Sequence, residues 1–90
     1  MPELVMYHLA RDEPGPPRLA FSVGSRVGGA VVRNRLKRRL REAARPLVAR
    51  LVACDILVVA RPQAVEATAA VLEQSLREAA ARAGVLRTDT

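Results

Sequence analysis

The sequence predicts a two-layer α/β sandwich of the α+β type, and three observations point to this class. Two early segments alternate in side-chain type with the period of a β-strand. A later run is continuously apolar, and two long segments repeat apolar residues at helical spacing. The order strand, strand, helix, strand, helix favours a single two-layer domain over residues 1–90.

The first predicted strand covers residues 3–10, and a turn-forming segment rich in proline follows it at residues 11–17. Alternation divides the strand into two sets of side chains: Leu4, Met6 and His8 on one face, and Val5, Tyr7 and Leu9 on the other. Because both sets are largely apolar, the pattern does not say which face meets solvent.

The second predicted strand covers residues 18–25 and has two unlike faces. Leu19, Phe21 and Val23 form an apolar face, whereas Ala20, Ser22 and Gly24 form a small, polar one. A strand face made of small residues allows a helix, another sheet or a ligand to approach closely.

The first predicted helix follows Gly28-Gly29, and its apolar residues fall in a stripe about 100° wide, as expected for a helix that covers a core. The stripe consists of Val32, Leu36, Leu40, Ala43, Leu47 and Leu51. Pro46 lacks an amide donor and clashes with the preceding turn, so we expect a kink or break at residues 44–45, with a continuation to residue 51.

The continuously apolar run at residues 55–60 predicts a central strand that is covered on both faces. The last predicted helix covers residues 65–83, with Val65, Ala69, Leu72 and Leu76 at core spacing. Gly84 is expected to end this helix, and residues from about 85 to 90 are expected to fray.

Positive charge is concentrated in one segment. The chain has 15 Lys and Arg against 9 Asp and Glu, which gives a net charge of +6 and a pI near 11.2. Residues 26–45 contain eight of those bases and only one of the acids, Glu42. Like charges four residues apart destabilise an isolated helix, so a polyanion is the expected partner, and guanidinium groups suit phosphate geometry. This pattern predicts a nucleic-acid-binding helix, whereas an ordinary solvated face interleaves both signs.

Several other classes fit the sequence poorly. No apolar run approaches the ~20 residues of a membrane span, and the N-terminus does not have the pattern of a secretory signal, so we expect a cytoplasmic protein without a membrane partner. One cysteine, Cys54, allows neither an internal disulfide nor a cysteine metal cluster. The acids are scattered and His8 is the only histidine, so we expect no catalytic residue and no metal ligand in this chain.

The basic helix and its flanks resemble the protein component of bacterial ribonuclease P. The shared pattern is Ser22-Val23 followed by Arg26-Val27-Gly28-x-Ala30-Val31-x-Arg33-Asn34-Arg35-x-Lys37-Arg38-x-x-Arg41-Glu42. Tyr7 in the first strand and Ala60-Arg61-Pro62 after the third extend the resemblance, which covers about residues 3 to 83. It implies a small mixed sheet with helices on one face and a left-handed crossover through the Arg-rich helix. It also implies a further N-terminal helix, which we expect to be absent from this chain.

The resemblance implies an accessory role in an endoribonuclease. The RNA subunit of that enzyme hydrolyses precursor tRNA at its mature 5′ end with Mg²⁺ that is bound mainly by the RNA, while the protein binds the catalytic RNA and the 5′ leader of the precursor. Together with the charge pattern, it assigns RNA binding to one set of residues: Arg26, Arg33, Asn34, Arg35, Lys37, Arg38, Arg41 and Arg45. It assigns the leader-binding cleft to Tyr7, Ser22 and Arg61.

One alternative function remains open at this stage. A non-catalytic RNA-binding module of the ribosome or of its assembly could share this fold and charge. DNA binding through a helix-turn-helix fits less well, because the neighbouring elements read as strands. We expect the protein to be a monomer apart from its RNA partners.

Overall fold

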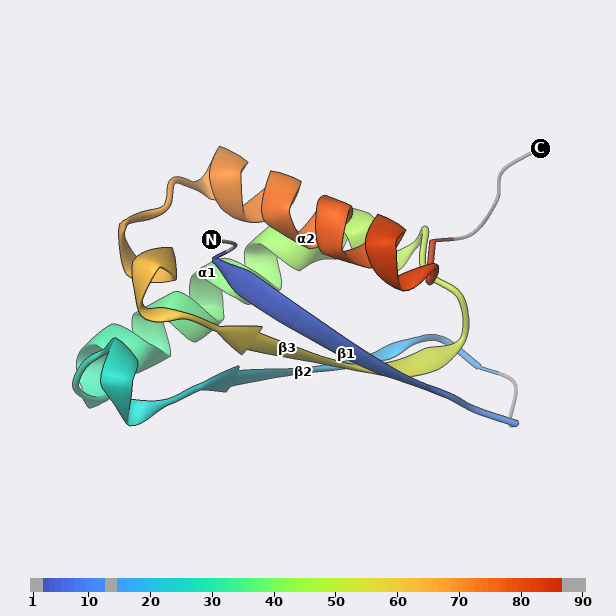
Figure 1. The fold of residues 1–90 in the computed structure, drawn as a ribbon, viewed down its shortest axis with the longest axis horizontal. Helices are drawn as coiled ribbons and strands as arrows, with labels where there is room; N and C mark the ends of the chain where they lie inside the picture. Colours follow the sequence, from blue (N-terminus) through green and yellow to red (C-terminus); the bar gives the residue numbers. More distant parts are fainter. Residues whose placement is uncertain (1–2, 13–14, 87–90) are drawn as a thin grey trace.

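A three-stranded sheet forms one layer of the molecule in the computed structural model, which describes residues 3–12 and 15–86. Strands β1 (Leu4–Ala10), β2 (Arg18–Val23) and β3 (Cys54–Ala60) lie in the order β1-β3-β2. β1 runs antiparallel to β3 and β2 runs parallel to it, so the sheet is mixed. The predicted central position of the third strand is confirmed (Figure 1).

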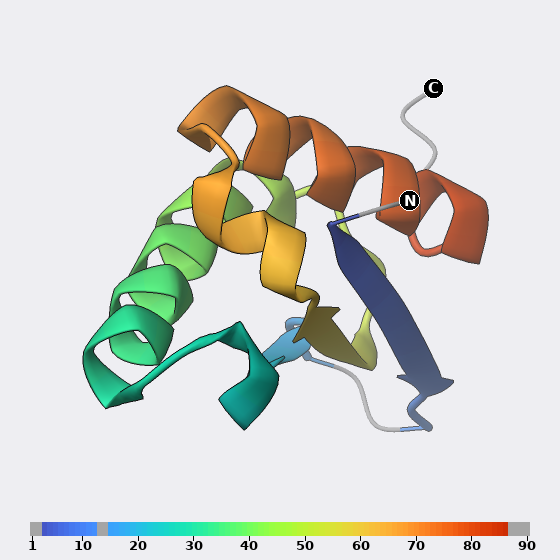
Figure 2. The same cartoon turned by 60° about the vertical axis from the view of Figure 1, so that its left-hand side comes forward.

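Two α-helices form the second layer, on one face of the sheet (Figures 1 and 2). α1 (Ala30–Val48) follows β2, and α2 (Ala69–Ala83) follows β3. Each α-helix is preceded by a short 3₁₀ helix, η1 (Ser25–Val27) before α1 and η2 (Pro62–Glu66) before α2. The predicted order of strands and helices is therefore confirmed, with two short turns added to it.

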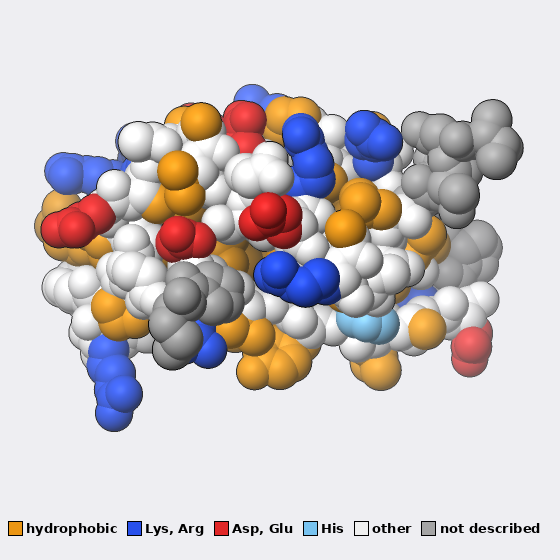
Figure 3. Space-filling model, turned by 45° about the horizontal axis from the view of Figure 1, so that its top comes forward, with side chains coloured by type: hydrophobic (Ala, Val, Ile, Leu, Met, Phe, Trp, Pro, Cys, Tyr) orange, Lys and Arg blue, Asp and Glu red, His pale blue; other side chains and the backbone are white. Residues whose placement is uncertain are grey.

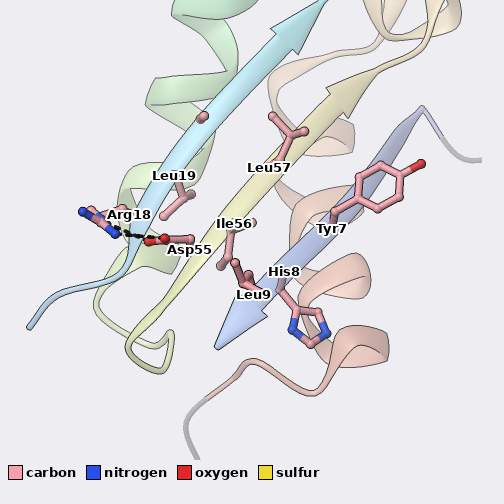
Figure 4. Close-up of a pocket in the computed structure, with 9 residues that line it drawn as sticks. Tyr7, His8, Leu9, Arg18, Leu19, Asp55, Ile56 and Leu57 are labelled. Carbon is pink, nitrogen blue, oxygen red and sulfur yellow. Dashed lines mark hydrogen bonds and ion pairs between the residues drawn. The ribbon is translucent and has the colours of Figure 1, made fainter. Parts of the chain in front are cut away.

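The connection from β2 through α1 to β3 is a left-handed crossover. Figure 4 looks onto the sheet face that the helices leave open, with α1 behind the strands. β2 and β3 run in the same direction in this view, and β3 lies to the right of β2. A chain that passes behind the sheet and returns on that side winds with the left hand, the rare choice for parallel strands.

The core lies between the helices and the sheet. Leu36 and Leu40 of α1, Leu72 and Leu76 of α2 and Val58 of β3 are each at most 2% exposed. Burying one such side chain stabilises the fold by about 1.5–3 kcal/mol, so these residues contribute strongly to the contact between the layers. The apolar stripe predicted for the first helix is the face that α1 buries.

The first helix does not break at residues 44–45, and it ends before the predicted residue 51. α1 continues through Pro46 and ends at Val48. Pro46 lies in the last turn, so only one intrahelical hydrogen bond is lost there, and Leu47 is still buried in the core. The buried leucine beyond the proline holds the chain in the helical path.

The last helix begins later than the apolar spacing predicts. Val65 belongs to η2, and Ala67 and Thr68 have extended backbone angles. The Thr68 side chain accepts a hydrogen bond from the Val71 amide at 3.2 Å, which caps α2 at Ala69. A capping threonine therefore sets the boundary that periodicity alone placed four residues too early.

Two further predictions, about which residues are buried, are wrong. β3 is covered on one face only, because Leu57 is 40% exposed while its neighbour Val58 is fully buried. The expected fraying does not begin at residue 85: Val85 is 2% exposed and its carbonyl accepts a bond from the Val52 amide, and Leu86 pairs with Leu51. Residues 87–90 of the expected tail lie outside the described residues.

Candidate RNA-binding surfaces

One face of the sheet is not covered by the described helices, and its middle is apolar. Strand register brings Tyr7 and Ala20 to either side of Leu57, and places Val5 and Ser22 on either side of Val59. Tyr7 is 59% exposed and Leu9 is 70% exposed. An aromatic ring beside small residues on an open sheet is a surface on which unstacked nucleobases can lie.

Charged side chains lie at the end of this open face where β2 begins (Figure 4). Arg18 donates two hydrogen bonds to the Asp55 carboxylate, from Nε at 2.7 Å and from Nη2 at 2.9 Å. Arg11 lies 3.6 Å from the same carboxylate and donates to the Pro16 carbonyl at 2.6 Å. The hydrogen bonds from Arg18 lower the pKa of Asp55, and those to Asp55 raise the pKa of Arg18.

A shallow pocket of ≈ 360 Å³ joins that ion pair to the apolar middle of the face. Tyr7, Leu57 and Ala20 line it together with Arg18 and Asp55. Asp55 would repel a phosphate on its own, but its charge is neutralised by the bidentate Arg18. The pocket therefore places the Tyr7 ring, on which a nucleobase can stack, in the same hollow as the Arg18–Asp55 ion pair.

The opposite end of the open face carries Arg61, directly after β3. Its amide donates to the Glu3 carbonyl at 2.9 Å, while its buried Nε has no hydrogen-bond partner among the described residues. Ser75 of α2 donates to the Glu3 carboxylate at 2.7 Å and lowers its pKa. The Glu3 carboxylate is therefore held by α2 and forms no ion pair with Arg61.

The exposed side of α1 is cationic. Six of the predicted RNA-binding residues are exposed to solvent and two are half-buried. The exposed ones are Arg26, Asn34, Arg35, Arg38, Arg41 and Arg45, and the half-buried ones are Arg33 and Lys37. The ion pairs found within residues 3–12 and 15–86 involve none of these side chains. Their charges are thus not neutralised by an ion pair inside the described part of the chain.

Arg39 differs from the other bases of α1. Its Nη1 donates to the Val65 carbonyl at 3.2 Å and its Nη2 donates to the Ala67 carbonyl. These bonds tie η2 and the segment after it to α1. Arg39 adds to the positive charge of α1, but its guanidinium is bound to the backbone of η2 and of the segment after it.

The side of the molecule that carries α2 lacks a comparable one-sign surface. Figure 3 looks onto this side and shows acidic side chains among the basic ones. Arg77 and Arg82 are accompanied there by Glu73 and Glu78 along the same helix. The strongly positive surface, with Glu42 as the acid among its bases, is therefore a property of α1 rather than of the whole molecule.

Residues 3–12 and 15–86 contain no group of three or more His, Cys, Asp or Glu that could hold a metal ion. Cys54 is buried, and burial raises the pKa of its thiol, so it is a poor nucleophile. In the same part of the chain, no helix is both long and apolar enough to cross a membrane.

Fold and surface together define a small RNA-binding protein built as an α+β sandwich, and the comparisons with known proteins agree. The family model described as Ribonuclease P matches residues 1–84. A ribonuclease P protein component from Gluconacetobacter diazotrophicus is 42% identical over 86 residues, which is 93% of this chain and 74% of that protein. Another from Mycolicibacterium gilvum is 44% identical over 81 residues, covering 87% of this chain and 65% of that protein.

A solved structure of the ribonuclease P protein from Staphylococcus aureus superposes with a TM-score of 0.81 at 33% identity, over 93% of this chain and 77% of that one. The chain belongs to the bacterial ribonuclease P protein family. It is the protein subunit of ribonuclease P, the endoribonuclease that processes the 5′ end of precursor tRNA, and it partners the ribonuclease P RNA.

The structure also adds residues to the open face that the sequence did not single out. Val5, Leu9 and Leu57 share this face with Tyr7 and Ser22, and Arg18 and Asp55 close one end of it. The alternation of the first strand could have pointed to Val5 and Leu9 if the solvent side had been known. The Arg18–Asp55 pair joins residues 37 positions apart, and no local pattern indicates it.

Proposed function

We propose that this protein uses two separate surfaces within ribonuclease P: the cationic side of α1 binds the catalytic RNA, and the open sheet face binds the 5′ leader of precursor tRNA. The observation that carries the proposal is the separation of the two by the sheet itself. The basic side chains without an ion-pair partner among the described residues lie in the helix layer, whereas Tyr7 and Ser22 lie on the open face of the sheet. One protein could therefore hold two RNA strands at once.

The two surfaces differ in the RNA that suits them. The α1 surface offers charges without aromatic side chains, which favours phosphate contacts to a folded RNA. The sheet face offers Tyr7 and an apolar middle, with Arg61 at one end and the neutral Arg18–Asp55 ion pair at the other, which favours a single strand with unstacked bases. We assign the 5′ leader of the precursor to this face as that single strand.

The protein contributes to the reaction by electrostatics. Its positive charge lowers the repulsion between catalytic RNA and substrate, and this makes binding less dependent on magnesium. As part of the proposal, we assign the catalytic Mg²⁺ ions to the RNA subunit and no step to a metal on this chain.

The test is cleavage of precursor tRNA by a bacterial ribonuclease P RNA at low magnesium, with and without this protein. We expect strong stimulation by the protein and no cleavage by the protein without RNA. Tight binding to the RNA without stimulation would contradict the proposed leader-binding role. Cleavage by the RNA-free protein would contradict the assignment of catalysis to the RNA.

A further inference from the structure

A hollow between α1 and η2 borders the cationic side of α1 and shares Arg35 with it. Its volume is ≈ 300 Å³, near the lower end of the range for small-ligand pockets. Its lining combines three apolar side chains with two guanidinium groups: Val32, Leu36 and Val65, and Arg35 and Arg39. Figure 2 shows η2 lying beside α1, where this hollow forms.

The apolar part of the hollow is built from both elements. Leu36 of α1 is 2% exposed, and Val32 of α1 and Val65 of η2 are half-buried. A ligand that consisted only of phosphate would gain nothing from these walls, because an anion loses hydration against apolar carbon. The lining therefore favours a ligand with a flat, apolar body.

Arg39 is held in one orientation at the wall of this hollow. Both terminal nitrogens of its guanidinium are bound to carbonyls, those of Val65 and Ala67, so the edge of the plane is occupied. A planar group fixed by its edge retains its faces for stacking, and guanidinium planes stack well on aromatic rings. Arg35, one turn earlier on α1, is exposed and keeps its charge for a phosphate.

We propose that this hollow binds one unstacked nucleobase of the catalytic RNA, with the base between the Val65 and Arg39 walls and its phosphate near Arg35. The inference rests on the proposed role of α1 as the surface that binds the RNA subunit. It adds a contact to a base where the charges of α1 provide contacts to phosphates only. Bases in loops and bulges of folded RNA are free to enter such a site, whereas bases stacked in a duplex are not.

The test compares valine-to-threonine substitutions, which keep the side-chain shape and place a hydroxyl in the apolar wall. Val65→Thr and Val32→Thr each change one apolar lining residue, from η2 and from α1, and Val71→Thr is the matched control at an exposed site on α2. We expect either wall variant to weaken binding of a bacterial ribonuclease P RNA by about fivefold or more, because the hydroxyl meets an apolar ligand without a partner. The slope of log affinity against log salt should stay unchanged, since no phosphate contact is lost.

Base-specific chemical probing of the RNA gives a second readout at saturating protein. At least one base should be protected by the wild-type protein and by Val71→Thr, and reactive with Val65→Thr. Wild-type affinity and an unchanged protection pattern in both wall variants would overturn the base site. Arg38→Ala separates this failure from that of the proposed function: a flatter salt slope in that variant keeps α1 as the RNA-binding surface, and an unchanged slope rejects both.

Discussion

At the residue scale, Asp55 shows how an acid can be part of an RNA-binding face. Its carboxylate lies on the open side of the sheet, where a free negative charge would repel a phosphate. Arg18 and Arg11 surround it, and the resulting pKa is below the ordinary aspartate value. The cluster also reaches Pro16, because Arg11 donates a hydrogen bond to the Pro16 carbonyl.

This lowered pKa predicts a pH-dependent effect of Asp55→Asn on stability. The folded state favours the ionised carboxylate, so the stabilisation is present above the pKa of the unfolded chain, near 4, and is lost as pH falls through the lower folded value. Wild type should therefore have the higher melting temperature at pH 7, and the difference between wild type and variant should shrink below about pH 4. A difference that stays constant from pH 7 to pH 3 would show that the pair does not contribute through its charge.

At the element scale, Gly28 controls how η1 leads into α1. Its φ is +155°, a value that other residues rarely adopt, and a Cβ placed there would lie 3.0 Å from Cγ1 and 3.1 Å from Cβ of Val32. Val32 is in the first turn of α1, so backbone and helix would both have to move. This junction also places Arg26 of η1 relative to the bases of α1.

We expect Gly28→Ala to lower the free energy of unfolding by about 1–3 kcal/mol, because the strained φ and the contact with Val32 act together. Gly24→Ala is the matched control: its φ is −79°, and a Cβ there meets nothing within 4 Å. The control should be neutral or slightly stabilising, as removing a glycine restricts the unfolded chain. Urea denaturation monitored by circular dichroism measures both, and equal effects in the two variants would contradict the explanation.

The sequence predicted the helices and strands well, but it predicted less well which faces of the sheet are covered. Periodicity placed Leu36, Leu40 and Leu47 on the buried side of α1, and the strand faces that hold Tyr7 and Ser22 are those that the register shows. Alternation could not say which side of the sheet lacks helices, because Val5 and Leu9 are as apolar as the residues that face the core. The apolar run of β3 was misread as covered on both sides for the same reason.

Contacts between distant segments account for the rest. The hollow between α1 and η2 needs Arg39 and Val65, which lie 26 positions apart and are joined by a hydrogen bond to a backbone carbonyl. A basic residue in a basic segment does not indicate such a bond, so Arg39 looked like one charge among several. Sequence reasoning therefore identified the kind of helix, and the structure separated the bases that face outward from the one that holds η2.

At the scale of the whole molecule, the sheet separates the helix that carries the unneutralised bases from the face that carries Tyr7. Sites with no shared contacts contribute almost additively to binding, within about 0.3–0.5 kcal/mol. If the two surfaces bind different RNAs, substitutions on one should leave the other unchanged. The proposed roles of the two surfaces can therefore be tested by combining one substitution from each surface in a double variant.

We expect Arg38→Ala to weaken binding of the catalytic RNA and to flatten its salt slope by about one unit, because one phosphate contact is lost. Tyr7→Ala should leave that binding unchanged and weaken the holoenzyme's affinity for precursor tRNA by about 1–3 kcal/mol, the contribution of stacking one base on an aromatic ring. A precursor without its leader should bind the wild-type and Tyr7→Ala holoenzymes equally. The double variant should show both losses and no coupling. A loss of catalytic-RNA binding in Tyr7→Ala would mean that the sheet face contacts the RNA subunit, and the division between the two surfaces would have to be abandoned.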